Sequence, residues 1–448
     1  MAETEGMRMQ DISKEKLLEG KKVEEQDCPL NGTTDHLSNV TIVEKGTSIP
    51  EFIKKKINSG FGEADQDAFY VADLSDVVDK YYRFQKELPG VKPFYAVKCN
   101  NSKEVIHTLS TLGAGFDCAS KAEIDLVLSL GVPADDIVYA NTCKQPCYIR
   151  HAAKHGVLKM TFDCESELIK VAENHPAAEM LIRIVANDSE AKSSLSKKFG
   201  VQLHKCEDLL KLAKVLNLAV TGVSFHIGTK SRQPKSFYQA IADSRYVFDL
   251  GKKVGHDMRL LDIGGGFPGD DDFQPGFEEF TAVISEALNQ YFPSKEEVEI
   301  ISEPGRFFVG SALTAALNII GKKEEYVTGT DGKEIRKLSY YMNDGVLGTF
   351  WVHELGGLKM KPLKDHHHSQ QQFPSRLWGP CCTDYDVIIE EVSLPDLEMG
   401  EWIIFPNKGA YSISNATTFN GFQIPAVYYT ISEDKMKKIQ KMRILAIQ

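Results

Sequence analysis

Short apolar runs alternate with longer amphipathic stretches along the chain from Phe69 onward. Runs of this length, bounded by polar or glycine-containing segments, are typical of strands in a buried parallel sheet. Eight such strands are predicted, at residues 93–97, 115–119, 137–140, 159–162, 180–185, 223–227, 260–263 and 299–302.

Between most of these runs, apolar residues recur with helical spacing, as at 121–130, 165–174, 209–216 and 236–253. Eight β/α units of this length predict an α/β fold, the TIM (β/α)8 barrel. An open, doubly wound sheet would give the same alternation. The barrel is favoured because it gathers all strand ends around one mouth, where residues distant in sequence can meet.

Reactive residue types lie in or directly after the carboxyl-terminal part of several predicted strands. Lys98 follows the first strand, and a glycine triplet at 264–266 follows the seventh. Asp117, Arg183 and His226 lie within the second, fifth and sixth predicted strands, and residues 303–306 follow the eighth. An open sheet would spread these side chains along an edge, whereas a barrel would place them in one site.

The pattern changes at both ends of the predicted barrel. Residues 1–38 are polar and without periodicity, which predicts a disordered N-terminal extension. After Arg306, strand-like runs at 340–350, 387–392, 402–405 and 427–431 predict a second, β-rich domain. We therefore expect residues 39–74 to be the N-terminal part of the β-domain, 75–312 the barrel and 313–448 the C-terminal β-domain.

Composition narrows the possible partners. The 448 residues carry a net charge of −11, which argues against general binding to nucleic acid or anionic membranes. A signal-peptide core and a run of about 20 apolar residues, enough to span a bilayer, are not found. Nine scattered cysteines fit a reducing compartment, so we expect a cytoplasmic protein with a small-molecule substrate.

No metal site is expected from the sequence. Cys143 and Cys147 are four residues apart but have no second pair of ligands nearby in sequence. Three consecutive histidines at 366–368 lie in a polar, glutamine-rich segment that is more typical of a solvated loop.

Three features together predict a pyridoxal 5′-phosphate (PLP) site. The glycine triplet at 264–266 and Gly305–Arg306 follow the last two strands, whose loops form the usual phosphate site of this barrel. Lys98 directly follows an apolar strand, where a lysine needs a partner or a covalent role. Glu303 supplies an acid for a pyridinium nitrogen. Taken alone, the glycines also fit a tight turn, and Lys98 also fits an ordinary lysine at the end of a strand. The combination of the three features favours Lys98 as the Schiff-base residue.

Several motifs, in order, resemble the eukaryotic ornithine decarboxylase family of PLP enzymes. They are PFYAVKCN at 93–100, FDCASK at 116–121, FH at 225–226, LDIGGGFPG at 261–269, SEPGR at 302–306 and WGP at 378–380. The resemblance covers about residues 65–432. It implies an alanine-racemase-like PLP-binding barrel plus a C-terminal β-domain, and an antiparallel homodimer with active sites at the interface.

The resemblance also implies roles for single residues. Lys98 would be the Schiff-base lysine, Glu303 would hold the pyridine nitrogen protonated, and His226 would stack on the cofactor ring. Cys382 would act across the dimer interface and protonate the carbon that loses CO₂. The remaining residues implied to hold the lysine, ring or phosphate are Asp117, Glu123, Arg183, Thr229, Gly265, Gly266, Pro304, Gly305, Arg306 and Tyr411.

The substrate pocket departs from the family pattern. Ornithine decarboxylases recognise the distal ammonium with two aspartates, whose positions here are Gly356 and Thr383. Leu355 and Leu347 replace tyrosines. An ammonium without a carboxylate partner is costly to bury, so ornithine should bind badly. We therefore expect an uncharged aliphatic substrate, with leucine the closest common fit.

Two alternatives stay open. Glu354 or Asp384 could replace the lost aspartates after a one-residue shift, although adjacent strand positions face opposite ways. The family also contains antizyme inhibitors, which bind the regulatory protein antizyme without catalysis and have typically lost residues of the cofactor site. Asp117, Arg306 and Tyr411 are present here, which favours an enzyme. Antizyme would bind at residues 145–161. The basic residues and the histidines His151 and His155 of this region are equally typical of a solvated helix face.

Overall fold

The computed structural model describes residues 37–59, 66–189, 191, 195–229, 231–293, 297–328, 332–350, 358–366 and 371–447. The N-terminal extension expected at 1–38 therefore lies almost wholly outside the described residues. So do Leu355 and Gly356 of the expected substrate pocket.

Eight parallel strands close into a barrel, in the order β10-β3-β4-β5-β6-β7-β8-β9. They are β3 (Val91–Ala96), β4 (Gly115–Cys118), β5 (Ile137–Tyr139), β6 (Lys159–Phe162), β7 (Glu179–Arg183), β8 (Ala219–Ser224), β9 (Leu260–Asp262) and β10 (Glu299–Ser302). The barrel confirms the predicted fold, and every predicted strand overlaps an observed one. The apolar runs arise because barrel strands contact side chains inside the barrel and helices outside it.

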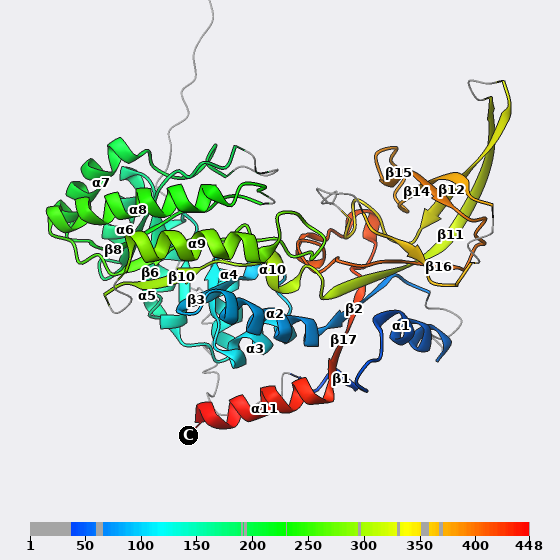
Figure 1. The fold of residues 1–448 in the computed structure, drawn as a ribbon, viewed down its shortest axis with the longest axis horizontal. Helices are drawn as coiled ribbons and strands as arrows, with labels where there is room; N and C mark the ends of the chain where they lie inside the picture. Colours follow the sequence, from blue (N-terminus) through cyan, green and yellow to red (C-terminus); the bar gives the residue numbers. More distant parts are fainter. Residues whose placement is uncertain are drawn as a thin grey trace, which may run out of the picture. The chain divides into compact units, whose positions relative to one another are not determined.

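Amphipathic helices cover the barrel (Figure 1). They are α2 (Leu74–Glu87), α3 (Lys103–Leu112), α4 (Lys121–Ser129), α5 (Pro146–Lys154), α6 (Glu165–Asn174), α7 (Leu203–Val215), α8 (Lys235–Val254) and α9 (Phe277–Tyr291), with the short α10 (Arg306–Val309) after β10. In α2, for example, Leu74, Val77, Val78 and Phe84 are buried on one face. Because each helix buries its apolar face against the strands, the barrel mouth is left to the loops that follow the strands.

A nine-stranded mixed sheet forms the second domain. Its strands are β1 (Val40–Val43), β2 (Phe69–Asp73), β11 (Leu313–Thr328), β12 (Glu334–Met342), β13 (Lys361–Pro362), β14 (Phe373–Trp378), β15 (Val387–Leu394), β16 (Trp402–Phe405) and β17 (Ala426–Ser432). The long β11 pairs with β2, β16 and β12, and β17 lies between β1 and β2. Helix α1 (Ile49–Asn58) lies beside β2 of this sheet, and α11 (Glu433–Ile447) follows β17 and contacts the barrel helix α3 as well as β1 and β17 (Figure 1).

The expected strand at 340–350 is only partly present. β12 ends at Met342, and the chain then turns around the buried carboxylate of Asp344. This carboxylate accepts hydrogen bonds from the backbone N–H groups of Gly345 (2.8 Å) and Thr349 (3.2 Å). The Asp344 carboxylate thus accepts the backbone N–H hydrogen bonds that a neighbouring strand would accept if β12 continued.

No helix in the described part of the chain combines the length and apolar character needed to cross a bilayer.

Candidate active site

An ion pair between Lys98 and Asp117 lies at the mouth of the barrel. Lys98 follows β3 in the short 3₁₀ turn η1 (Val97–Cys99), and Asp117 lies on the adjacent strand β4, where it is in register with Ala96. The Lys98 Nζ contacts Asp117 Oδ2. Asp117 is fully buried, whereas 41% of the Lys98 side chain is exposed. The carboxylate is thus held inside the barrel wall and the amine faces the open mouth.

Charge determines the protonation of Lys98. Burial alone would lower its pKa, but the carboxylates of Asp117 and Glu303 outweigh burial and hold the pKa above the usual range. Asp117 Oδ2 is in position to accept a proton from the amine. The second oxygen of Asp117, Oδ1, is buried and has no hydrogen-bond partner among the described residues.

Glu123 supports this pair from the start of α4. Its Oε2 accepts a hydrogen bond from the backbone N–H of Ala119 at 2.5 Å, and the hydroxyl of Ser120 accepts one from the N–H of Glu123. Burial raises the pKa of Glu123, and the nearby charge of Asp117 adds to the increase. These two hydrogen bonds at the start of α4 therefore fix Glu123 within the electrostatic reach of Asp117 and Lys98.

A second pair of acids, Glu303 and Asp262, lies at the ends of β10 and β9. Burial, reinforced by the neighbouring carboxylate of Asp262, raises the pKa of Glu303 well above its ordinary value. Burial also raises the pKa of Asp262, to about 6. Asp262 is held by the N–H of Gly264, which donates to its Oδ1 at 2.8 Å. The raised pKa favours the protonated form of Glu303, which can donate its proton to a basic nitrogen placed against it.

His226 presents a neutral imidazole after β8. The backbone N–H of Gly228 donates to its Nδ1 at 2.9 Å, so the ring hydrogen lies on Nε2. Burial and the charges of Arg183 and Lys98 hold its pKa well below the usual range. A neutral ring fixed in this way can stack on a flat cofactor ring. Arg183, on the last position of β7, lies over the ring of Phe199, 5.2 Å from its centroid, and Thr229 is half-buried just beyond Gly228.

The glycine triplet is compressed between the loops after β8 and β10. A Cβ at Gly265 would lie 2.4 Å from the carbonyl oxygen of Glu303, and one at Gly266 would lie 2.3 Å from that of Gly228. Gly266 also has a φ of +110°. Only glycine permits the three loops after these strands to approach so closely. Without side chains, backbone N–H groups of the triplet can be reached by an anion.

Arg306 and Tyr411 complete this side of the mouth. The Arg306 guanidinium lies 5.3 Å from the centroid of the Tyr411 ring, and Arg306 Nε is buried without a hydrogen-bond partner in the described part of the chain. Pro304 and Gly305 link Arg306 to Glu303, so the acid and the arginine are separated by a single short turn. Buried donors normally have an acceptor, so a guanidinium N–H without one indicates that a ligand supplies it. A phosphate oxygen is a suitable acceptor for arginine.

The sheet domain reaches the barrel mouth through the loop that carries Tyr411. Tyr411 has a φ of +56°, rare for a residue with a side chain. Its N–H donates to the carbonyl oxygen of Cys99 at 2.8 Å, and the Ser414 hydroxyl donates to the same oxygen at 3.0 Å. Asn100 Nδ2 in turn donates to the carbonyl oxygen of Gly409 at 3.1 Å. These bonds fix Tyr411 beside the turn that carries Lys98.

These residues fit PLP. Asp117 Oδ1 and Arg306 Nε are buried polar atoms without partners among the described residues, and a Cβ would fill the cradle at the glycine triplet. An amine, a proton-holding acid and a neutral ring surround the same mouth, as a PLP site requires. The structure thus brings together the sequence-predicted residues of the barrel and Tyr411.

Sequence comparison agrees with this arrangement. Residues 74–310 match the family described as "Pyridoxal-dependent decarboxylase, pyridoxal binding domain". The chain is 48% identical over 413 residues to ornithine decarboxylase of Rattus norvegicus, covering 89% of each chain. It is 47% identical over 411 residues to antizyme inhibitor 2 of Xenopus laevis, covering 91% of this chain and 90% of that one. The protein belongs to the ornithine decarboxylase and antizyme inhibitor family. Its cofactor is pyridoxal phosphate.

Solved structures of amino-acid decarboxylases have the same fold. The arginine decarboxylase of Paramecium bursaria Chlorella virus bound to agmatine aligns with a TM-score of 0.79 at 34% identity, covering 85% of this chain and all of that one. The lysine/ornithine decarboxylase of Vibrio vulnificus complexed with cadaverine aligns with a TM-score of 0.75 at 30% identity, covering 85% and 99%. Both are named for basic amino acids, so the comparisons support a decarboxylase family and do not name leucine.

In this member of the ornithine decarboxylase and antizyme inhibitor family, Cys382 lies on a loop of the sheet domain. Its thiol is exposed and accepts a hydrogen bond from Asn420 Nδ2 at 3.6 Å. Asp386 fixes the loop, since its buried carboxylate accepts from the N–H groups of Val346 (2.7 Å) and Cys381 (2.8 Å). One carboxylate therefore ties the Cys381–Cys382 turn to the segment that precedes Leu347.

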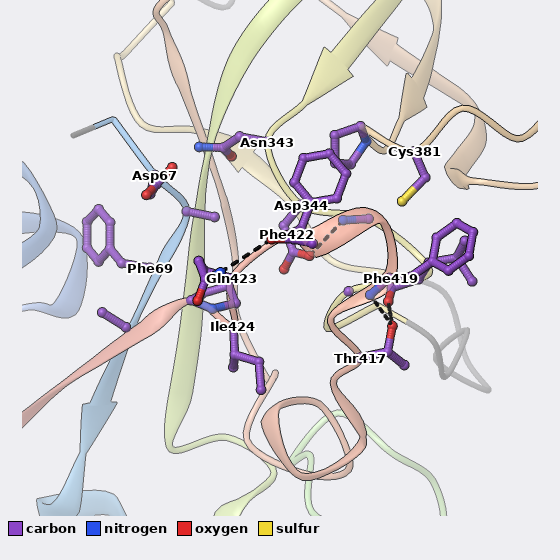
Figure 2. Close-up of a pocket in the computed structure, with 18 of the residues that line it drawn as sticks. Asp67, Phe69, Asn343, Asp344, Cys381, Thr417, Phe419, Phe422, Gln423 and Ile424 are labelled. Carbon is purple, nitrogen blue, oxygen red and sulfur yellow. Dashed lines mark hydrogen bonds between the residues drawn. The ribbon is translucent and has the colours of Figure 1, made fainter. Parts of the chain in front are cut away.

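A cavity of about 510 Å³ lies beside this loop. Cys381 and Phe419 lie at one end of it, and Asp67 and Phe69 lie at the other (Figure 2). Leu347 also lines the cavity, and its carbonyl oxygen accepts a hydrogen bond from the Thr417 hydroxyl. Leu347, which was expected to replace a tyrosine of the family, thus places an apolar residue on the cavity wall.

Thr383 is the member of the expected substrate pocket that the structure describes. It is half-buried, and its Oγ1 has no hydrogen-bond partner among the described residues. Leu355 and Gly356 fall outside those residues, so the pocket that they were expected to form stays a prediction.

Three carboxylates that organise the site were not singled out from the sequence. They are Asp262, Asp344 and Asp386. Each is buried and lies close to an apolar run, after it for Asp262 and Asp344 and before it for Asp386, which is the signal that could have identified them.

Proposed function

We propose that the protein decarboxylates an uncharged aliphatic L-amino acid, with leucine the first candidate, to the corresponding amine and CO₂. The observation that carries this proposal is the absence of a carboxylate at the two positions where ornithine decarboxylases place their recognition aspartates. Thr383 offers a half-buried hydroxyl at one, and Gly356 offers no side chain at the other. Neither can compensate the charge of a buried ammonium, whereas an aliphatic side chain has no such requirement.

The barrel residues would hold the cofactor in this reaction. Lys98 would bind it covalently, with Asp117 accepting the proton that the amine must lose. Glu303 would donate its proton to the ring nitrogen and remain as the carboxylate partner of that nitrogen. His226 would cover one ring face, while the glycine triplet, Arg306 and Tyr411 would hold the phosphate. When bound, the cofactor supplies an electron sink for the carbon that loses CO₂.

Cys382 would supply a proton to that carbon from the partner of a homodimer. The support is the surface beside its loop: Phe419, Phe422 and Ile424 line the cavity and are 49%, 42% and 45% exposed. Large apolar side chains exposed together are typical of protein interfaces. Asn420, which donates to the Cys382 thiol, lies within the same segment. We infer that a second copy of the chain covers this surface and receives Cys382 in its barrel mouth.

Overall similarity favours a second candidate function. The relatives named above are an ornithine decarboxylase and an antizyme inhibitor, so this chain could act on ornithine or bind antizyme instead. Similarity over the whole chain, however, does not report on the four substituted pocket positions. The retained Lys98, Asp117 and Arg306 favour catalysis over a purely binding role.

Restoring both aspartates tests the substrate proposal. In the variant Gly356→Asp with Thr383→Asp, we expect kcat/KM for leucine to fall by at least about tenfold, because an apolar side chain would meet buried carboxylates. The ratio of ornithine to leucine kcat/KM should rise. Full ornithine activity is not expected, since Leu347 and Leu355 lack the tyrosine hydroxyls.

The matched control is Gly356→Asn with Thr383→Asn, which adds the same volume without charge. It should lower leucine activity without raising the preference for ornithine. If the aspartate and asparagine variants showed the same preference, charge at these positions would not select the substrate, and the proposal would be wrong.

A further inference from the structure

A cluster of three potential metal ligands lies away from the barrel mouth, between α4 and α5. It consists of Asp125 on α4, His151 on α5 and His155 at the C-terminal end of α5. One ligand atom from each lies within 4.8 Å of the others. The decarboxylation site uses none of these side chains.

The helix geometry accounts for the cluster. His151 and His155 are four residues apart, so their side chains lie on the same face of the helix, and their ring centroids are 4.2 Å apart. The adjacent helix α4 brings Asp125 to that face, and its Oδ1 contacts His151 Nε2 at 2.5 Å. His155 is the C-cap residue of α5, where the negative end of the helix dipole favours a cation.

A hydrogen bond fixes the ring tautomer of His155 in a way that suits a metal ion. His155 Nδ1 lies 2.9 Å from the carbonyl oxygen of His151. A carbonyl only accepts, so Nδ1 carries the hydrogen and Nε2 presents its lone pair. Metal-binding histidines commonly donate their second ring N–H to a backbone carbonyl in this manner. His151 Nε2 donates its hydrogen to Asp125 Oδ1. A metal ion bound at Nε2 would displace that hydrogen as a proton released to solvent from the doubly protonated ring, and the remaining ring hydrogen would lie on Nδ1.

We propose that Asp125, His151 and His155 form a zinc-class metal site. Two imidazole nitrogens and a carboxylate oxygen suit Zn²⁺, and water would complete the coordination. Zinc bonds of about 2.0–2.1 Å place tetrahedral ligands about 3.3 Å apart. Asp125 and His155 are exposed, so their side chains can rotate to close the cluster from 4.8 Å. The bound ion would join two neighbouring barrel helices.

Zinc titration of the holoenzyme, freed of metal with a chelator, tests this site. Calorimetry should detect one equivalent of Zn²⁺ per chain. His155→Ala and Asp125→Asn should each weaken binding by at least about tenfold. The matched control is His204→Ala, which removes an exposed histidine from α7 and should bind Zn²⁺ as the unmodified protein does. Decarboxylase activity should be unchanged in all three variants.

Zinc could instead bind to the thiol of Cys147, because this exposed side chain lies one turn before His151 on α5. Cys147→Ala should retain the zinc affinity. Zinc should also raise the thermal unfolding midpoint of the unmodified protein and of Cys147→Ala, but not that of His155→Ala, since an ion that binds only the folded cluster stabilises it by mass action. Loss of binding in Cys147→Ala alone, or equal binding and stabilisation in His155→Ala, would overturn the proposal and leave an ordinary histidine–aspartate contact.

Discussion

Replacement of Lys98 by alanine is expected to abolish decarboxylation, lowering kcat by several orders of magnitude. The variant lacks the amine that would bind the cofactor covalently. It also leaves the fully buried carboxylate of Asp117 without its cation, which is unfavourable inside the barrel. We therefore expect the variant both to lose the visible absorption of the bound cofactor and to have a lower free energy of unfolding.

A second variant separates the two effects. Lys98→Arg keeps a cation for Asp117 but cannot form the covalent bond, so it should recover much of the stability without recovering activity. The measurement is the cofactor absorption after borohydride reduction and dialysis, with Lys121→Ala on α4 as an exposed control. If Lys98→Ala or Lys98→Arg retained cofactor covalently after this treatment, another residue would be the attachment point.

Mixing inactive Lys98→Ala and Cys382→Ala subunits is expected to restore activity. In a hybrid dimer, one site contains both substitutions and the other contains neither. With random exchange of equal amounts, half of the dimers are hybrids with one intact site, so activity should reach about a quarter of that of the unmodified protein. Cys382→Ala alone should lower the rate by about a hundredfold or more, as expected for loss of a proton donor.

Cys381→Ala is the matched control for the role of Cys382. The Cys381 thiol lines the cavity, and burial and the nearby Asp386 raise its pKa to about 11. Its loss should leave activity largely unchanged, and hybrids of Lys98→Ala with Cys381→Ala should gain no more activity than their own Cys381→Ala subunits supply. Absence of recovery with Cys382→Ala, in hybrids verified by differential affinity tags, would exclude a site shared between subunits.

The barrel could be predicted from the sequence because its strands are buried on both faces. Runs such as Ile137–Tyr139 and Leu260–Asp262 consist of apolar residues with a polar residue at most at the end, so their boundaries were clear. The strand expected at 340–350 was harder to delimit. Apolar residues continue past Met342, but Asp344 supplies side-chain acceptors that turn the chain.

The grouping of the site residues on the barrel strands could be predicted, because closure of the barrel brings the carboxyl ends of all eight strands together. Contacts between the domains could not be predicted in this way. The hydrogen bond from Tyr411 N–H to Cys99 joins residues more than 300 positions apart and depends on a positive φ at a tyrosine. Similarly, the pKa of Glu303 is raised by burial and then by the carboxylate of Asp262, and both arise only after β9 and β10 pair in the closed barrel. The catalytic and cofactor-binding roles of single residues came from the motif resemblance, because the hydrophobic pattern and the residue spacing do not indicate them.

The most direct test of the account is CO₂ release by the purified, PLP-loaded protein from leucine and from ornithine, each supplied alone. We expect PLP-dependent release of CO₂ from leucine with formation of the corresponding amine, and much slower release from ornithine. Efficient release from ornithine with none from leucine would contradict the proposed substrate and assign the ammonium to another partner, such as Glu354 or Asp384.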